Sequence, residues 1–184
     1  VVGSALAITG ATAASASTSP SKGIRYLANI DTIEAQALAG IEQMAANGRI
    51  GELAGDKNFT ATPFAIYTLS AETITGNYSS ALPSLEAVAV LETTKIGFLM
   101  KSEGNPVAYK VVGLDNAGTI ISQVTDVNNR ATSITAAMAQ LSALDEVSQG
   151  AYEARLLTIH TNGKVLPKTF LVVWLKADVG NNDL

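Results

Sequence analysis

The segment YEARLLTIHTNGKVLPKTFLVVWLKA, residues 152–177, carries the clearest folding signal in this chain. Two apolar runs flank Asn162-Gly163, a dipeptide that suits a type I′ turn because both central residues must take positive φ. We therefore predict a β-hairpin that joins residues 152–161 to residues 164–177. The run FLVVWL, residues 170–175, is apolar on both faces, which predicts a central strand covered on both sides.

Further strand-like runs precede this hairpin. They have the composition and the bounding turn residues of β-strands and cover residues 24–30, 59–69, 85–92, 95–101, 107–114 and 119–127. The segments 102–106 (SEGNP) and 115–118 (DNAG) have turn chemistry and separate neighbouring strands. Pro63 interrupts one run, which indicates a sheet edge or a bulge there.

Two segments have the residue spacing of amphipathic helices. The first begins at the capping pattern Asp31-Thr32-Ile33-Glu34 and ends at Asn47-Gly48. Its predicted buried face consists of Ile33, Ala37, Leu38, Ile41 and Met44. The second helix begins with a cap at Thr132 or Ser133 and ends at Gly150. Its predicted buried face consists of Ile134, Met138, Leu141, Leu144 and Val147.

Together these elements predict a mainly β protein, α+β by content. The expected architecture is an antiparallel β-sandwich or jelly-roll-like domain with two amphipathic helices and an N-terminal extension strand. Residues 1–22 form the extension, and residues 23–184 form one β-rich globular domain. At least five strands run consecutively between the two helices, which argues against a doubly wound parallel sheet.

Composition narrows the classes of function. Charged residues make up 15% of the 184 residues, hydrophobic residues 47%, and the net charge is −4. These values exclude intrinsic disorder and argue against a nucleic-acid partner, which requires a basic surface. No apolar run is long enough for a membrane-spanning helix. With so few charges, either uncharged polar residues coat the surface or other copies of the chain cover it.

The chain offers little catalytic or metal-binding chemistry. It has no cysteine and one histidine, His160, which we expect to face solvent on a strand. Neither a nucleophile elbow nor a phosphate-binding loop is present. The acidic and amide clusters at 126–129 and 178–183 suit Asx turns better than a calcium site. We therefore predict no catalytic residue, no cofactor and no metal site. Asn58 and Asn77 begin glycosylation sequons.

Residues 1–22 contain no charge before Lys22. Val2, Leu6 and Ile8 alternate with smaller residues, with Ser4 between them, and this period of two favours a strand with one apolar face. An Ala-rich helix is the competing prediction. The strand is expected either to pair with a neighbouring subunit or to pack along its own domain. Ala14-Ser15-Ala16 also has the small residues of a signal-peptidase site.

An uncharged, strand-capable extension (VVGSALAITG) before a cysteine-free, charge-poor, β-rich domain resembles donor-strand filament subunits, including archaeal and bacterial pilins and biofilm-matrix fibre proteins. The chain lacks the long N-terminal helix of type IV pilins and the disulfide of chaperone–usher pilins. The resemblance implies a structural subunit, not an enzyme, that forms a head-to-tail homopolymer outside the cell or at its surface. Val2, Ser4, Leu6 and Ile8 would form the inter-subunit strand, and neighbouring filaments or surfaces would be further partners.

Two other classes of function remain open. A viral capsid or tail protein also combines a charge-poor β-domain with an N-terminal arm, although arms that contact a genome are usually basic. A secreted monomeric ligand-binding module or enzyme is the second alternative.

Overall fold

The computed structural model describes residues 22–50, 58–70, 84–127, 129–161, 168–178 and 183–184. The elements, in chain order, are β1 (Gly23–Arg25), α1 (Asp31–Ala46), β2 (Phe59–Ser70), α3 (Leu85–Val88), β3 (Val90–Ser102), β4 (Asn105–Leu114), β5 (Ile120–Asp126), α4 (Asn129–Ser142), α5 (Asp145–Gln149), β6 (Ala151–Thr161) and β7 (Lys168–Ala177). The predicted mainly β content is confirmed.

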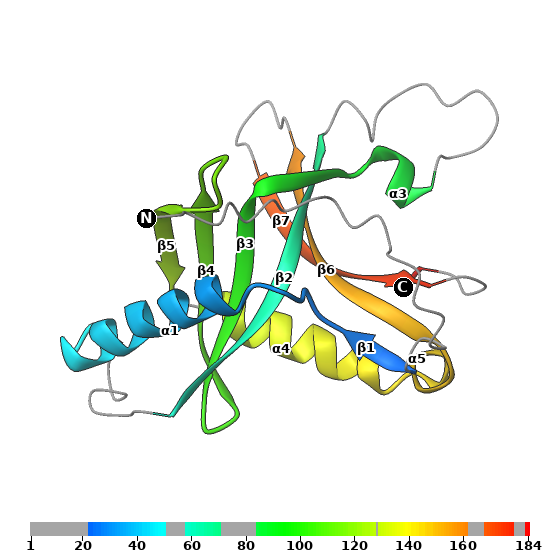
Figure 1. The fold of residues 1–184 in the computed structure, drawn as a ribbon. Helices are drawn as coiled ribbons and strands as arrows, with labels where there is room; N and C mark the ends of the chain where they lie inside the picture. Colours follow the sequence, from blue (N-terminus) through cyan, green and yellow to red (C-terminus); the bar gives the residue numbers. More distant parts are fainter. Residues whose placement is uncertain (1–21, 51–57, 71–83, 128, 162–167, 179–182) are drawn as a thin grey trace.

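All seven described strands belong to one mixed, open sheet (Figure 1). Strands β2, β3, β4 and β5 form an antiparallel meander. Strand β6 runs parallel to β2 along its second half and parallel to β1 along its first three residues. On its other side β6 pairs with β7 in antiparallel register, from Tyr152 opposite Ala177 to Thr161 opposite Lys168. The sheet therefore has β5 at one edge and β7 at the other.

Two tight turns explain the meander. Between β3 and β4, Glu103 and Gly104 both take positive φ, at 48° and 83°, as a two-residue hairpin requires. Between β4 and β5, the Asp115 carboxylate accepts hydrogen bonds from the backbone N–H groups of Ala117 and Thr119, at 2.9 and 2.8 Å. This is the Asx-turn chemistry that the sequence predicts.

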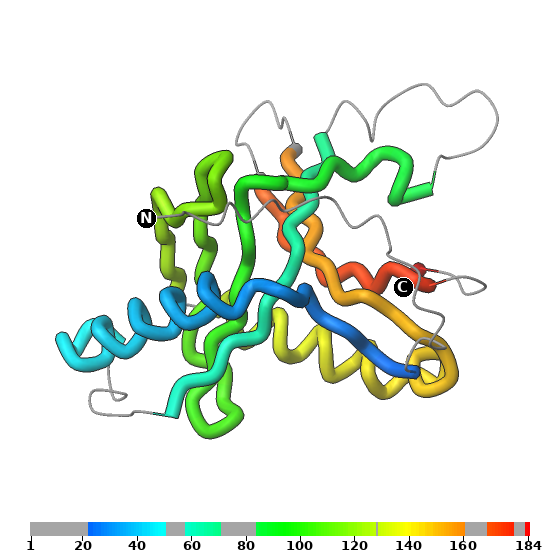
Figure 2. The backbone as a smooth tube through the Cα atoms, viewed as in Figure 1, coloured from blue at the N-terminus to red at the C-terminus, as the bar shows by residue number. Residues whose placement is uncertain are grey.

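The helices α1 and α4 cover opposite faces of the sheet. Side chains alternate along β4, so that Val112 packs toward α1 and Tyr109 packs toward α4. The core is therefore divided into two clusters, one for each helix. Figure 2 shows that the ends of β2, β6 and β7 continue past α4, which leaves part of that face without a helix over it.

Helix α1 confirms the first predicted helix, with Ile33, Ala37, Ile41 and Ala45 buried. Its N-cap position is Ile30 and has no side-chain cap; Asp31 is the first helical residue, which corrects the predicted capping pattern. Lys110, on β4, is 1% exposed and donates a hydrogen bond from Nζ to the Ala37 carbonyl at 3.0 Å. Burial lowers the pKa of Lys110.

The second predicted helix is two helices. Helix α4 begins at Asn129, so Thr132 and Ser133 lie within it, and the chain leaves the helical path before α5 begins at Asp145. Leu144, predicted to be buried, is 39% exposed because it occupies this break. Residues 85–92 also differ from the prediction of a strand, because Leu85–Val88 form the helical turn α3 before β3.

The predicted pairing of residues 152–161 with residues 164–177 is confirmed by β6 and by β7, which begins at Lys168, but the central strand is β6 rather than β7. Strand β7 pairs with β6 alone, and its Phe170 and Val172 are 51% and 40% exposed. The turn predicted at Asn162-Gly163 lies outside the described residues. At Pro63, β2 pairs only with β3, since its pairing with β6 begins at Ala65.

The predicted β-sandwich or jelly roll is not confirmed. Every strand of the described residues lies in the same sheet, and two of its pairings are parallel. Helices, rather than a second sheet, provide the layers that cover its two faces.

Candidate functional site

The four predicted inter-subunit residues, Val2, Ser4, Leu6 and Ile8, lie outside the described residues, as does Asn77 of the second sequon. Asn58 of the first sequon is exposed and directly precedes β2. Two surfaces of the described part of the chain have features of a functional site. One is the outer edge of β5, and the other is a cleft beside α4.

The outer edge of β5 pairs with no strand within the described ranges. Four consecutive side chains, from Ile121 to Val124, are exposed, and Ile121 and Val124 reach 68% and 66%. The sequence from Ile120 to Thr125 contains no charged residue and no proline. Soluble proteins usually protect such edges with lysine, proline or a bulge that turns the edge away. The pairing of β5 with β4 has a register shift between Ile120 and Ser122, so within the described residues the regular, uncovered part of this edge runs from Ser122 to Asp126.

The other edge, β7, is partly occupied. Leu175 and Leu184 exchange two backbone hydrogen bonds, at 2.8 and 3.0 Å, so the C-terminal residue lies against this strand. Asp183 accepts hydrogen bonds from the backbone N–H of Ala177 and from the indole of Trp174, both at 3.0 Å. These contacts cover one end of β7, so within the described residues its outer edge is only partly free.

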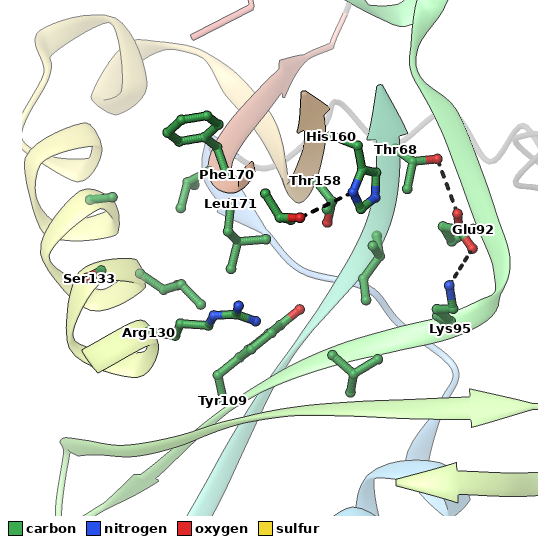
Figure 3. A pocket seen from close by; sticks show the side chains of 16 residues that line it. Thr68, Glu92, Lys95, Tyr109, Arg130, Ser133, Thr158, His160, Phe170 and Leu171 are labelled. Atoms are coloured by element: carbon green, nitrogen blue, oxygen red, sulfur yellow. Dashed lines mark hydrogen bonds and ion pairs between the residues drawn. The ribbon is translucent and has the colours of Figure 1, made fainter. Parts of the chain in front are cut away.

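The cleft has a volume of about 450 Å³ and lies between α4 and the ends of β2, β6 and β7 (Figure 3). Its apolar walls include Ile66, Val111, Ile134, Leu171 and Val173. Polar side chains gather at its rim and at both ends. They are Thr68, Glu92, Lys95, Tyr109, Arg130, Ser133, Thr158, His160 and Thr169.

Tyr109 is the most buried polar group of the cleft, with 4% of its surface exposed. Its ring crosses β3 at Gly97, where a Cβ atom would lie 2.9 Å from the Tyr109 hydroxyl. Burial raises the pKa of Tyr109 to about 12, and the nearby positive charge of Arg130 acts in the opposite direction. The phenol therefore remains protonated at neutral pH and can donate a hydrogen bond.

Arg130 comes from the first turn of α4 and points toward Tyr109 in Figure 3. Its Nε lies 3.2 Å from Oδ2 of Asp126 at the end of β5. A second ion pair, between Lys95 and Glu92 at 3.1 Å, lies on the opposite rim, and Glu92 also accepts a hydrogen bond from Thr68 at 3.2 Å. The two positively charged side chains that line the cleft, Lys95 and Arg130, are thus each paired with a carboxylate.

His160 lies near the end of β6 and is exposed, which confirms the prediction of a solvent-facing strand residue. Its Nδ1 is 3.3 Å from the Thr169 hydroxyl, and both residues line the cleft. Within the described ranges, no cluster of three or more histidine or acidic residues has the arrangement of a metal site. The described helices also include none with the length and apolar character needed to cross a membrane.

Sequence reasoning did not identify the cleft. Tyr109, Arg130 and His160 are far apart in the chain, and no motif links them. The β5 edge could have been found, because six consecutive uncharged residues in a strand that follows a hairpin loop, Ile120 to Thr125, are a recognisable signal. Comparison with known proteins gives no further identification, since no protein-family model, curated protein or solved structure matches the chain.

Proposed function

We propose that this protein is a structural subunit that self-assembles into a filament by strand addition. The N-terminal strand of one copy, with Val2, Ser4, Leu6 and Ile8, would pair with the outer edge of β5 in the next copy. The observation that supports this proposal is the outer edge of β5, which pairs with no described strand, has no charged residue from Ile120 to Thr125, and exposes Ile121 and Val124.

The lengths of the two partners agree. Residues 2–8 span seven positions, and β5 has seven residues, of which those from Ser122 to Asp126 follow the register shift and offer a regular edge. Main-chain hydrogen bonds would supply the affinity, while Val2, Leu6 and Ile8 on one face would contact exposed apolar side chains beside the edge. This mechanism extends a single open sheet, and it does not need the β-sandwich that the sequence predicted.

Strand donation from one end of a copy to the edge of the next is a heterologous contact. Such a contact repeats from copy to copy. It produces a fibre when the rotation between copies does not close a ring. The low charge of the chain agrees with burial between copies, because 15% charged residues is below the roughly 25% of average soluble domains. We place the filament outside the cell or at its surface, as the resemblance to pilins and biofilm fibres implies.

Light scattering and negative-stain microscopy on four proteins test the proposal. The full chain should form filaments, whereas a chain without residues 1–16 and the Val124→Lys variant should not. Val90→Lys is the matched control, since Val90 is also 66% exposed but lies on β3. Closed shells would support the capsid alternative. A monomer at all concentrations, or filaments that form equally well with Val124→Lys, would contradict strand addition at β5.

A further inference from the structure

The cleft beside α4 combines an apolar interior with a buried hydrogen-bond donor and a fixed positive charge. We infer that it binds a small molecule with an apolar body and a single carboxylate group, which contacts Tyr109 and Arg130. Ligand sites in proteins are commonly clefts of roughly 300–1,000 Å³ with mostly apolar walls and a few convergent polar groups. The volume of about 450 Å³ and the lining of this cleft agree with that description.

The hydroxyl of Tyr109 indicates a hydrogen-bond acceptor in the ligand. Only 4% of Tyr109 is exposed, and Figure 3 shows its oxygen pointing into the cleft. No buried side-chain N or O atom of the described residues lacks a hydrogen-bond partner, so the Tyr109 hydroxyl, for which those residues provide no partner, reaches the open space of the cleft. An acceptor atom of a bound molecule would provide that partner.

Arg130 indicates that the acceptor is negatively charged. Asp126 contacts its Nε at 3.2 Å, which holds the guanidinium at the rim near Tyr109. A guanidinium carries five N–H donors, so its Nη groups can still bind a carboxylate in a bidentate manner. The phenol and the guanidinium together would bind one carboxylate from two directions.

The charges of the lining restrict the ligand further. Lys95 and Arg130 would repel a cationic molecule, and Glu92 on the opposite rim disfavours a second negative charge. The space between these rims is lined by Ile134 and Leu171, which favours an apolar body over a sugar or a nucleotide. A monocarboxylate with an aromatic or branched aliphatic body fits these conditions.

This inference does not depend on filament formation. No residue of β5 lines the cleft; Asp126, which contacts Arg130, ends β5 but lies outside the uncharged edge from Ile120 to Thr125. The two proposals can therefore fail separately.

Saturation-transfer NMR with phenylbutyrate at millimolar concentration tests the inference on the full chain. Phenylbutyramide, which has the same body without the charge, is the ligand control. Tyr109→Phe removes only the hydroxyl, and Arg130→Gln removes the guanidinium with its positive charge. Arg25→Gln is the matched protein control, because Arg25 also forms an exposed ion pair, with Asp178 at 2.6 Å, but does not line the cleft.

We expect phenylbutyrate to bind to the wild type and to Arg25→Gln with equal affinity. Tyr109→Phe should weaken binding about 3- to 10-fold and Arg130→Gln about 10-fold or more, as expected for one hydrogen bond and one charge-assisted pair. Circular dichroism confirms that each variant is folded. Equal binding of the amide, equal binding by both cleft variants, or no binding of phenylbutyrate to the wild type would overturn the inference.

Discussion

Replacing Tyr109 with phenylalanine should change how the stability of this protein depends on pH. Burial raises the pKa of Tyr109 from its ordinary value of 10.0 to about 12. The folded protein therefore holds this proton more tightly than the unfolded chain does. The resulting stabilisation is complete below pH 10 and is lost as the pH rises toward 12. A pKa difference of about two corresponds to about 2.7 kcal/mol in the free energy of unfolding.

Urea unfolding followed by Trp174 fluorescence measures this loss. At about pH 9 the wild type and Tyr109→Phe should differ by less than about 0.5 kcal/mol, since the hydroxyl has no partner within the described residues. Between about pH 10 and pH 12 the wild type should lose about 2–3 kcal/mol more than the variant.

A second buried group contributes with the opposite sign. Burial lowers the pKa of Lys110, so the cost of its charge in the folded state disappears as the pH rises toward the ordinary lysine value of 10.5. This contribution is the same in both proteins and cancels in their difference. If the two stability curves run parallel from about pH 9 to about pH 12, Tyr109 is not held in the buried environment that we describe.

Three further substitutions test the packing that positions these sites, each by urea unfolding at neutral pH. Gly40→Ala should destabilise the protein by about 1–3 kcal/mol, because the Cβ atom that alanine adds meets Nζ of Lys110. This cost is expected to exceed the gain from the better helix propensity of alanine, and a stabilised variant would contradict the packing. Arg155→Lys should lower the free energy of unfolding by about 1–2 kcal/mol, because it removes the two hydrogen bonds to Glu153, at 2.9 and 3.1 Å, and the stacking of the guanidinium on the Tyr67 and Trp174 rings. An unchanged urea midpoint would contradict these contacts. Asp183→Ala should cost about 1–2 kcal/mol through the lost acceptor of the buried Trp174 indole on β7, and an unchanged urea midpoint would contradict these contacts.

Local patterns predicted most elements of the fold. The spacing of Ile33, Ala37 and Ile41 predicts α1, and the turn residues at 102–106 and 115–118 predict the meander of β3, β4 and β5. These signals act over a few residues, so a single sequence contains them.

Non-local pairing was the part that the sequence did not reveal. The run at 170–175 is apolar on both faces, yet β7 is an edge strand, because β6 is the strand that pairs with β1 and β2. The parallel pairing of β2 with β6 joins segments about 90 positions apart in the chain, from Ala65 opposite Arg155 onward. No turn residue between them specifies that contact, and this pairing replaces the predicted sandwich with one mixed sheet.

The same reason explains why the cleft was missed. Tyr109 reaches it over Gly97 from a neighbouring strand, Arg130 comes from α4, and His160 comes from β6. Each residue has an ordinary local context, and only the pairing order of the strands brings the three side chains to one cavity. The open edge of β5, by contrast, depends on a single strand and its composition.

A mixing experiment tests strand addition most directly. A chain without residues 1–16 retains β5 and can only accept a strand, whereas the full chain with Val124→Lys can only donate one. Each protein alone should remain a monomer by sedimentation velocity, the full-length variant near the calculated 19.0 kDa and the shortened chain below that mass. Their equimolar mixture should form a heterodimer and no larger species. A mixture that remains monomeric would contradict strand donation to the edge of β5.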